Sequence, residues 1–427
     1  MEWRKLLATN SARLLNLGLR SATLGTRFLF IFFLAKYLDP ASVGYYGIFT
    51  ATVGYAVYFI GLDFYTYVSR EILKTPTEQR GKLLKSQAAL SGVLYVALLP
   101  VAIVLLAQAG WPGHLVWWFL PILVLEHFNQ EISRLLIALS EQLTASIILF
   151  IRQGSWALAI IALMVFYTNA RSLGAVMALW AMAGVLAAGV AVWKLKRLKI
   201  TGWDLSIDWV WLKKGIAVST AFLLATLALR GIQTFDRYWL EALGGIELVG
   251  AYVLLLSVAG TLLTFLDAAV FSFAYPALIQ HHYKGEHLVA RKKVKLLLVQ
   301  TLLMSVVFGV VSWLLLPYFL DWIANPVYQN HIHWYPWLLS AMTINALGLV
   351  PHFALYARGE DKPIIYSHVA GLLAFIGVTW AISGQYSALA VPIGLNVAFS
   401  FILFIKSISY WALIRKENNI TPIVLQV

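Results

Sequence analysis

The sequence predicts an all-α, polytopic membrane protein with twelve transmembrane helices in two six-helix lobes, related by an internal repeat, with both termini cytoplasmic. Three observations support this fold class. Of the 427 residues, 61% are hydrophobic and only 12% are charged, and the mean hydropathy is +0.78. Apolar runs of about 20 residues, the length that crosses a bilayer, recur along the whole chain. Lys and Arg gather in alternate connecting segments, as the positive-inside rule requires.

The apolar runs divide the chain into twelve expected helices. In chain order they are 10–38, 42–68, 83–108, 114–139, 143–167, 172–193, 216–240, 246–275, 294–318, 334–357, 363–382 and 386–412. We therefore expect an N-terminal six-helix lobe at 1–193, a cytoplasmic amphipathic linker at 194–215 and a C-terminal six-helix lobe at 216–427. Four residues would share one face of a surface helix in and after the linker: Leu205, Trp209, Leu212 and Ile216.

The distribution of basic residues fits this topology. With both termini inside, 23 of the 32 Lys and Arg, Lys406 among them, fall in cytoplasmic segments, against two outside, Lys36 and Arg171. The net charge of +13 is thus explained by proximity to anionic lipid, and we expect no nucleic acid as a partner. Seven arginines remain within the expected spans: Arg13, Arg20, Arg27, Arg134, Arg152, Arg230 and Arg237.

Two pairs of segments indicate an internal repeat. "VGYYGIFTATVGYAVYF" from Val43 and "VGAYVLLLSVAGTLLTF" from Val249 share five residues at equal offsets. The helices before them carry polar stripes at helical spacing. The first stripe contains Thr9, Arg13, Asn16, Arg20, Thr23 and Arg27, and the second contains Thr226, Arg230, Gln233 and Arg237. The sequence therefore predicts one basic stripe in each lobe.

An arginine facing lipid at the bilayer centre costs about 2.5–3.5 kcal/mol, so these stripes are expected to face the bundle interior or a water-filled cavity. One interpretation is structural pairing with five intramembrane acids: Asp63, Glu126, Glu131, Asp236 and Asp267. Seven arginines exceed five acids, however, and the guanidinium fork matches phosphate oxygens. The second interpretation is an anion-binding cavity with these substrate-binding residues: Arg20, Arg27, Arg230, Arg237, Arg152, Asn16 and Gln233. Whether the acids couple transport to an ion or only pair with arginines stays open.

Several kinds of chemistry are not indicated. The sequence has no Cys and no phosphate-binding Gly-Lys-Ser/Thr loop, and its His-rich loops lack the spacing of a zinc site. We expect no metal, no cofactor and no enzymatic activity. His127, His352 and His368 are interpreted as interior histidines whose hydrogen bonds are satisfied.

Four segments, "LDPASVGYYG", "SREI", "DRYWLEALGGIELVGAY" and "YARGEDKP", together with the twelve spans, resemble the Wzx polysaccharide flippases over residues 10–412. These belong to the multidrug/oligosaccharidyl-lipid/polysaccharide exporter superfamily. The resemblance implies two lobes around a cationic cavity, in the bacterial inner membrane. It also implies alternating access, which moves an undecaprenyl-diphosphate-linked oligosaccharide, such as an O-antigen unit, from the inner to the outer leaflet. Arg20 and Arg27 lie where related lipid II flippases carry cavity arginines, although a thirteenth and fourteenth helix are lacking.

The expected partners are the lipid-linked glycan and membrane lipid, with a polysaccharide polymerase and a chain-length regulator as further candidates, and we expect a monomer. Two other functions are alternatives. A multidrug or organic-cation antiporter of the same superfamily would share the architecture but select cations. A membrane polysaccharide polymerase or ligase would carry a large outer loop with catalytic basic residues, and the longest outer segment, 319–333, has no Lys or Arg.

Overall fold

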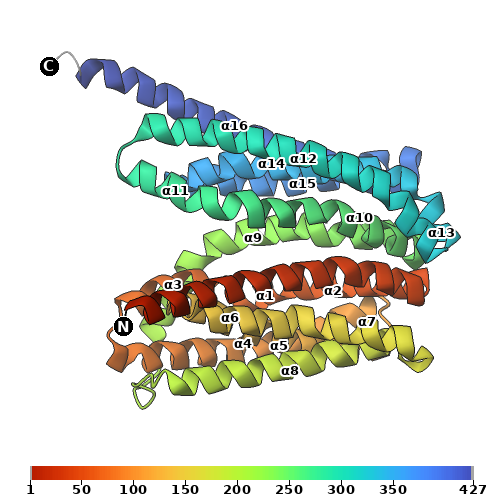
Figure 1. Cartoon of the computed structure of the whole chain (residues 1–427), viewed down its shortest axis with the longest axis horizontal. Coiled ribbons are helices and arrows are strands. Elements are labelled where there is room, and N and C mark those ends of the chain that lie inside the picture. The colour runs from red at the N-terminus through yellow and green to blue at the C-terminus, as the bar shows by residue number, and fades with distance from the viewer. Residues whose placement is uncertain (1, 425–427) are drawn as a thin grey trace. The chain divides into compact units, whose positions relative to one another are not determined.

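The computed structural model describes the backbone of residues 2–424 and the side chains of residues 14–418, and over this range the chain is helical without strands (Figure 1). The first half contains these elements: α1 (Glu2–Tyr37), α2 (Pro40–Gly61), α3 (Tyr65–Lys74), α4 (Arg80–Gln108), α5 (Gly113–Ala138), α6 (Gln142–Phe150), η2 (Ile151–Ser155), α7 (Trp156–Phe166) and α8 (Leu173–Arg197). The second half contains these: α9 (Trp209–Gly244), α10 (Ile246–Leu266), η4 (Asp267–Phe271), α11 (Ser272–Tyr283), α12 (His287–Ile323), α13 (Pro326–Asn330), α14 (Tyr335–Tyr356), α15 (Asp361–Tyr386) and α16 (Ala390–Val424).

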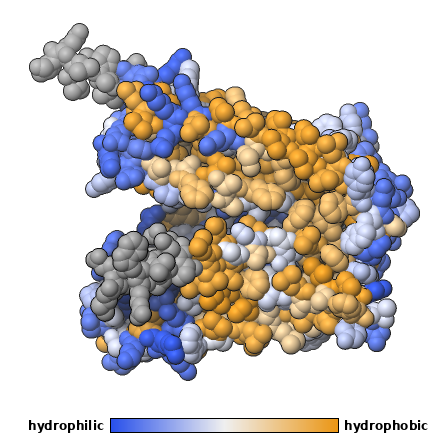
Figure 2. Space-filling model, in the orientation of Figure 1, coloured by the Kyte–Doolittle hydropathy of each residue, from blue (hydrophilic) through white to orange (hydrophobic). Residues whose placement is uncertain are grey.

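The all-α membrane fold is confirmed, and each of the twelve expected helices has a counterpart. Ten stretches of the described residues are long and apolar enough to cross a membrane; one of them, 361–418, contains both α15 and α16. Helix α5, which carries Glu126, Glu131 and Arg134, is the remaining expected span. On the face seen in Figure 2, apolar side chains cover the middle of the helices and hydrophilic ones gather at the ends.

Three expected spans are interrupted. Leu62 and Asp63, both with φ of 51°, separate α2 from α3, so the span expected at 42–68 is two helices. The π-helical turns η2 and η4 interrupt the spans expected at 143–167 and 246–275. Hydropathy misses such breaks because it reports apolar composition and not the backbone hydrogen-bond pattern.

The chain divides into two compact units whose bounds differ from the expected lobes. Unit 1 comprises Met1–Leu38 and Ile48–Leu223, and unit 2 comprises Asp39–Gly47 and Leu224–Val427. The first turns of α2 thus pack with the second half of the chain. The linker expected at 194–215 packs within unit 1, and the boundary falls inside α9.

The expected amphipathic linker helix is helical only from Trp209 onward, as part of α9, because residues 198–208 form an irregular segment tied to the start of α4. The Gly81 amide donates to the carbonyl of Thr201 (2.8 Å), and Lys82 forms a 2.8 Å ion pair with Asp208. The hydrogen bond from Lys82 holds the pKa of Asp208 below its ordinary value. The Asp208 carboxylate also accepts from the Trp211 amide (2.9 Å) at the start of α9, so the helix begins only at Trp209.

A reciprocal glycine contact joins α2 and α10 within unit 2. A Cβ on Gly44 would lie 2.2 Å from the carbonyl oxygen of Ile246, and a Cβ on Gly250 would lie 2.1 Å from that of Pro40. Gly44 and Gly250 are 206 residues apart, as are Pro40 and Ile246, and this is the offset of the repeated Val-Gly pair. The repeated motif therefore packs against its own second copy, which small residues allow by close backbone approach.

We predict that Gly250→Ala lowers the free energy of unfolding by about 1–3 kcal/mol, because the added methyl group meets the Pro40 backbone, which cannot turn away. Gly260→Ala is the matched control on the same helix, since a Cβ there would have nothing within 4 Å. Unfolding of the detergent-solubilised proteins provides the measurement. Equal stability of the two variants would contradict the proposed close contact.

Candidate functional site

The polar stripe of α1 lies against α6, and one of its arginines, Arg20, donates to a serine. Arg20 is exposed and donates from Nε to the Ser146 hydroxyl (3.2 Å). The same hydroxyl donates to the side-chain oxygen of Asn16. Arg20 and Asn16 are therefore brought together by a residue that the sequence analysis did not single out. Arg13 lies outside the residues whose side chains are described.

The last arginine of the stripe, Arg27, is also exposed and donates to the side-chain oxygen of Gln153 (3.1 Å). Gln153 belongs to the π-helical turn η2, where Gly154 packs close to the backbone of Thr23. Arg20 and Arg27 are seven residues apart, which is about 10 Å along the helix axis. Thr23, between them, is buried and donates to the carbonyl of Leu19 (2.8 Å).

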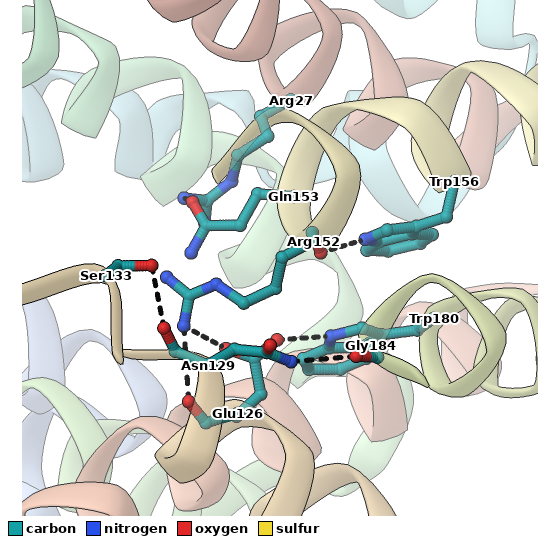
Figure 3. A network of polar contacts seen from close by, with 9 residues as sticks. All are labelled: Arg27, Glu126, Asn129, Ser133, Arg152, Gln153, Trp156, Trp180 and Gly184. Carbon is teal, nitrogen blue, oxygen red and sulfur yellow. Dashed lines mark hydrogen bonds and ion pairs between the residues drawn. The ribbon is translucent and has the colours of Figure 1, made fainter. Parts of the chain in front are cut away.

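The residue before Gln153 forms a buried polar network (Figure 3). Arg152 is 5% exposed and donates from Nη1 to Oε2 of Glu126 (2.9 Å). The other carboxylate oxygen, Oε1, accepts from the Trp180 indole (2.8 Å), and the Trp156 indole donates to the carbonyl of Arg152 (2.8 Å). Arg152 is therefore the structural partner of Glu126 and does not join the exposed stripe.

Glu131, the second acid of α5, has its own arginine. It forms a 2.9 Å ion pair with Arg134 and accepts from the Gln87 amide (2.8 Å). Arg134 in turn lies 3.4 Å from the centre of the Tyr65 ring. Glu131 and Gln87 line a cavity of about 310 Å³ within unit 1, together with His127. This ion pair supports the structural interpretation of Glu131.

The stripe of α9 in unit 2 differs from that of α1. Asp236 is 1% exposed, forms a 3.1 Å ion pair with Arg237 and accepts from the Tyr252 hydroxyl (2.6 Å). Arg237 also donates to the carbonyl of Gln233, whose side-chain oxygen accepts from exposed Arg230 (3.4 Å). These hydrogen bonds of Arg237 and Arg230 stay within their own helix, whereas those of Arg20 and Arg27 reach a neighbouring helix.

The bounds of α1 and α9 do not place the arginines of the two stripes at equivalent positions. Both ends of α9 follow those of α1 by 207 residues, whereas the arginine match requires 210. The arginines of the two stripes are therefore displaced by three residues, almost one turn.

The remaining two acids lie at the breaks in the repeated helices. Asp63 is buried at the α2–α3 break, and Asp267 is exposed at the start of η4. Their common position, 204 residues apart, agrees with the internal repeat. Among the described residues, no group of three or more His, Cys, Asp or Glu is arranged to hold a metal ion.

One expected cytoplasmic residue lies elsewhere. Lys406 is 2% exposed within α16 and hydrogen-bonds to His368 of α15 (3.1 Å between Nζ and Nε2). Its assignment to the cytoplasmic face is therefore wrong. Its position inside the span expected at 386–412 was a signal that could have identified it.

Comparison with known proteins extends these observations to the fold. No family model matches the chain, and no curated protein matches its sequence. Among solved structures, it is similar to an inward-facing multidrug resistance MATE family transporter of the MOP superfamily, with a TM-score of 0.76 and 13% identity over 93% of this chain and 99% of that one. A mutant of the Vibrio cholerae MATE transporter VcmN matches with a TM-score of 0.65 and 12% identity over 96% of each chain. An outward-facing MATE transporter matches with a TM-score of 0.62 and 14% identity, over 95% of this chain and 96% of that one. The chain is a multi-pass membrane protein with the fold of these transporters.

We predict that Glu126→Ala lowers the free energy of unfolding by about 3–5 kcal/mol, because it leaves Arg152 buried without its counter-charge. The double variant E126Q/R152M, which keeps side-chain volume but removes both charges, should lose less of the free energy of unfolding than Glu126→Ala. Unfolding in detergent of E126Q, of R152M and of the double variant measures the coupling. As a control, Glu71→Ala, in the exposed pair with Lys74, should cost under about 1 kcal/mol. Additive losses at Glu126 and Arg152 would argue against the pair.

Proposed function

We propose that this chain is a transporter of the bacterial inner membrane that moves an undecaprenyl-diphosphate-linked oligosaccharide from the inner to the outer leaflet by alternating access. The observation that carries the proposal is the pair of exposed arginines on α1. Within the described residues, Arg20 and Arg27 form no ion pair, and their hydrogen bonds go to the neutral oxygens of Ser146 and Gln153. Their positive charge is therefore available to an anion.

The geometry of these contacts suits a diphosphate. Arg20 uses Nε for Ser146, which leaves its two terminal NH₂ groups for further acceptors, and Arg27 uses one Nη of its two. Guanidinium groups bind phosphate oxygens two at a time. The bonds to α6 and η2 also restrict the side chains before a ligand arrives, which reduces the entropy lost on binding. In this proposal the diphosphate binds Arg20 and Arg27, while the polyprenyl tail remains in lipid.

A second candidate function is export of organic cations. Two of the solved structures that the chain resembles are described as multidrug resistance transporters, which favours this alternative, although at 13–14% identity they share the fold alone. An exposed stripe of unpaired guanidinium groups would repel a cationic substrate. We therefore place the anionic substrate first.

We predict that Arg20→Ala and Arg27→Ala each weaken binding of undecaprenyl diphosphate by roughly ten- to a hundred-fold, the loss expected for a charge-assisted hydrogen bond. Binding is measured on the full chain in lipid nanodiscs. In cells lacking the gene for this chain, the same variants should fail to restore export of the lipid-linked glycan.

The matched control is Lys74→Ala, which removes one exposed positive charge from unit 1 away from α1. It should bind and transport like the wild-type chain. Unchanged diphosphate binding in both arginine variants would reject the proposal. Resistance to ethidium conferred by the wild type, and retained in Arg20→Ala, would instead establish the cation exporter.

A further inference from the structure

Unit 2 contains a buried basic cluster that the proposed anion site does not use. Lys406 of α16 is 2% exposed and His368 of α15 is 7% exposed. Their side chains are hydrogen-bonded at 3.1 Å, and the ring of His352, from α14, stacks on that of His368 at 6.2 Å with 6° between the planes. Three neighbouring helices thus direct basic nitrogens to one point.

The hydrogen bonds fix where the protons lie. Nδ1 of His368 is 3.2 Å from the carbonyl oxygen of Ala225, which can only accept, so Nδ1 carries a hydrogen. In a neutral ring Nε2 is then the acceptor, and Lys406 donates to it. A second hydrogen on His368 would point at Lys406 and require a neutral amine there. The pair therefore holds one excess proton and not two.

The surroundings do not supply a counter-charge. Within residues 14–418, Lys406 forms no ion pair with a carboxylate. From α14, His352 stacks on His368 and Tyr356 stacks on His352. On α16, Tyr410 follows Lys406 by four residues and lies under the guanidinium of Arg358, and on α9 Arg230 follows Ala225 by five residues. A buried positive charge without an anion carries a desolvation penalty. A purely structural role rarely requires such a buried, uncompensated charge.

We propose that the Lys406–His368 pair is a proton-binding site of unit 2, and that its gain and loss of a proton couple the transport cycle to the proton gradient. When the proton leaves, the neutral amine of Lys406 still donates to Nε2 of His368, so the helices stay joined. Nδ1 of His352 is buried without a hydrogen-bond partner among the described residues and offers a next acceptor. The coupling, but not the site itself, rests on the proposed transport function.

The site is tested first without transport. The full chain is labelled with ¹⁵N-histidine in lipid bilayers, and the spectrum of His368→Asn is subtracted to isolate His368. We expect the Nδ1–H tautomer, and an Nε2 signal whose midpoint of titration shifts by at least one pH unit in Lys406→Met and Lys406→Gln. Gln retains a donor to His368 and so protects against misfolding. The control is Lys416→Met, at an exposed position on the same helix; in this variant His368 should titrate as it does in the wild type.

Coupling is tested second, by transport of the lipid-linked glycan or of ethidium, whichever the wild type carries, between pH 5 and 9. The rate should depend on pH in the wild type and Lys416→Met, and lose that dependence in Lys406→Gln. An unshifted His368 titration in both Lys406 variants would overturn the site. A shifted titration with unchanged pH dependence of transport would overturn the coupling. Absence of transport of either substrate would contradict the proposed function and leave the spectroscopic result standing as a separate finding.

Discussion

A charged side chain within a membrane needs an opposite charge, a hydrogen-bond partner or water, and this constraint organises the arginines of the chain. Arg152, Arg134 and Arg237 each meet an acid within hydrogen-bonding distance. Arg20 and Arg27 meet neutral oxygens and remain exposed. These five arginines therefore fall into two classes, those that form ion pairs with acids and those whose hydrogen bonds go to neutral oxygens.

The two classes meet at the π-helical turn η2. Arg152 and Gln153 are adjacent in sequence, yet one enters the buried network of Glu126 and the other meets Arg27 at the surface. A π-turn inserts one extra residue into the helix and changes the direction of the side chains that follow, which is why such turns recur at functional sites. The buried ion pair thereby fixes the turn that presents Gln153 to α1.

The sequence predicts the fold far better than the site. Apolar runs and the basic loops gave twelve helices in the right order, since both signals are local in the chain. The partners of the arginines depend on which helices are neighbours, so Ser146, Gln153 and Trp180 could not be identified from one sequence. The stripes looked equivalent by spacing, but Asp236 neutralises Arg237 from the adjacent position. The rule that places Lys in cytoplasmic segments fails for Lys406, because this side chain is buried in α16 and hydrogen-bonds to His368.

The contact between Gly44 and Gly250 also has a mechanical consequence. Because it holds the first two turns of α2 in unit 2, this helix has residues 40–47 in one unit and 48–61 in the other, and α9 likewise changes units after residue 223. The units are therefore joined by two continuous helices and not only by flexible tethers. Both crossings between the units are made within regular helix, in α2 near residue 47 and in α9 near residue 223.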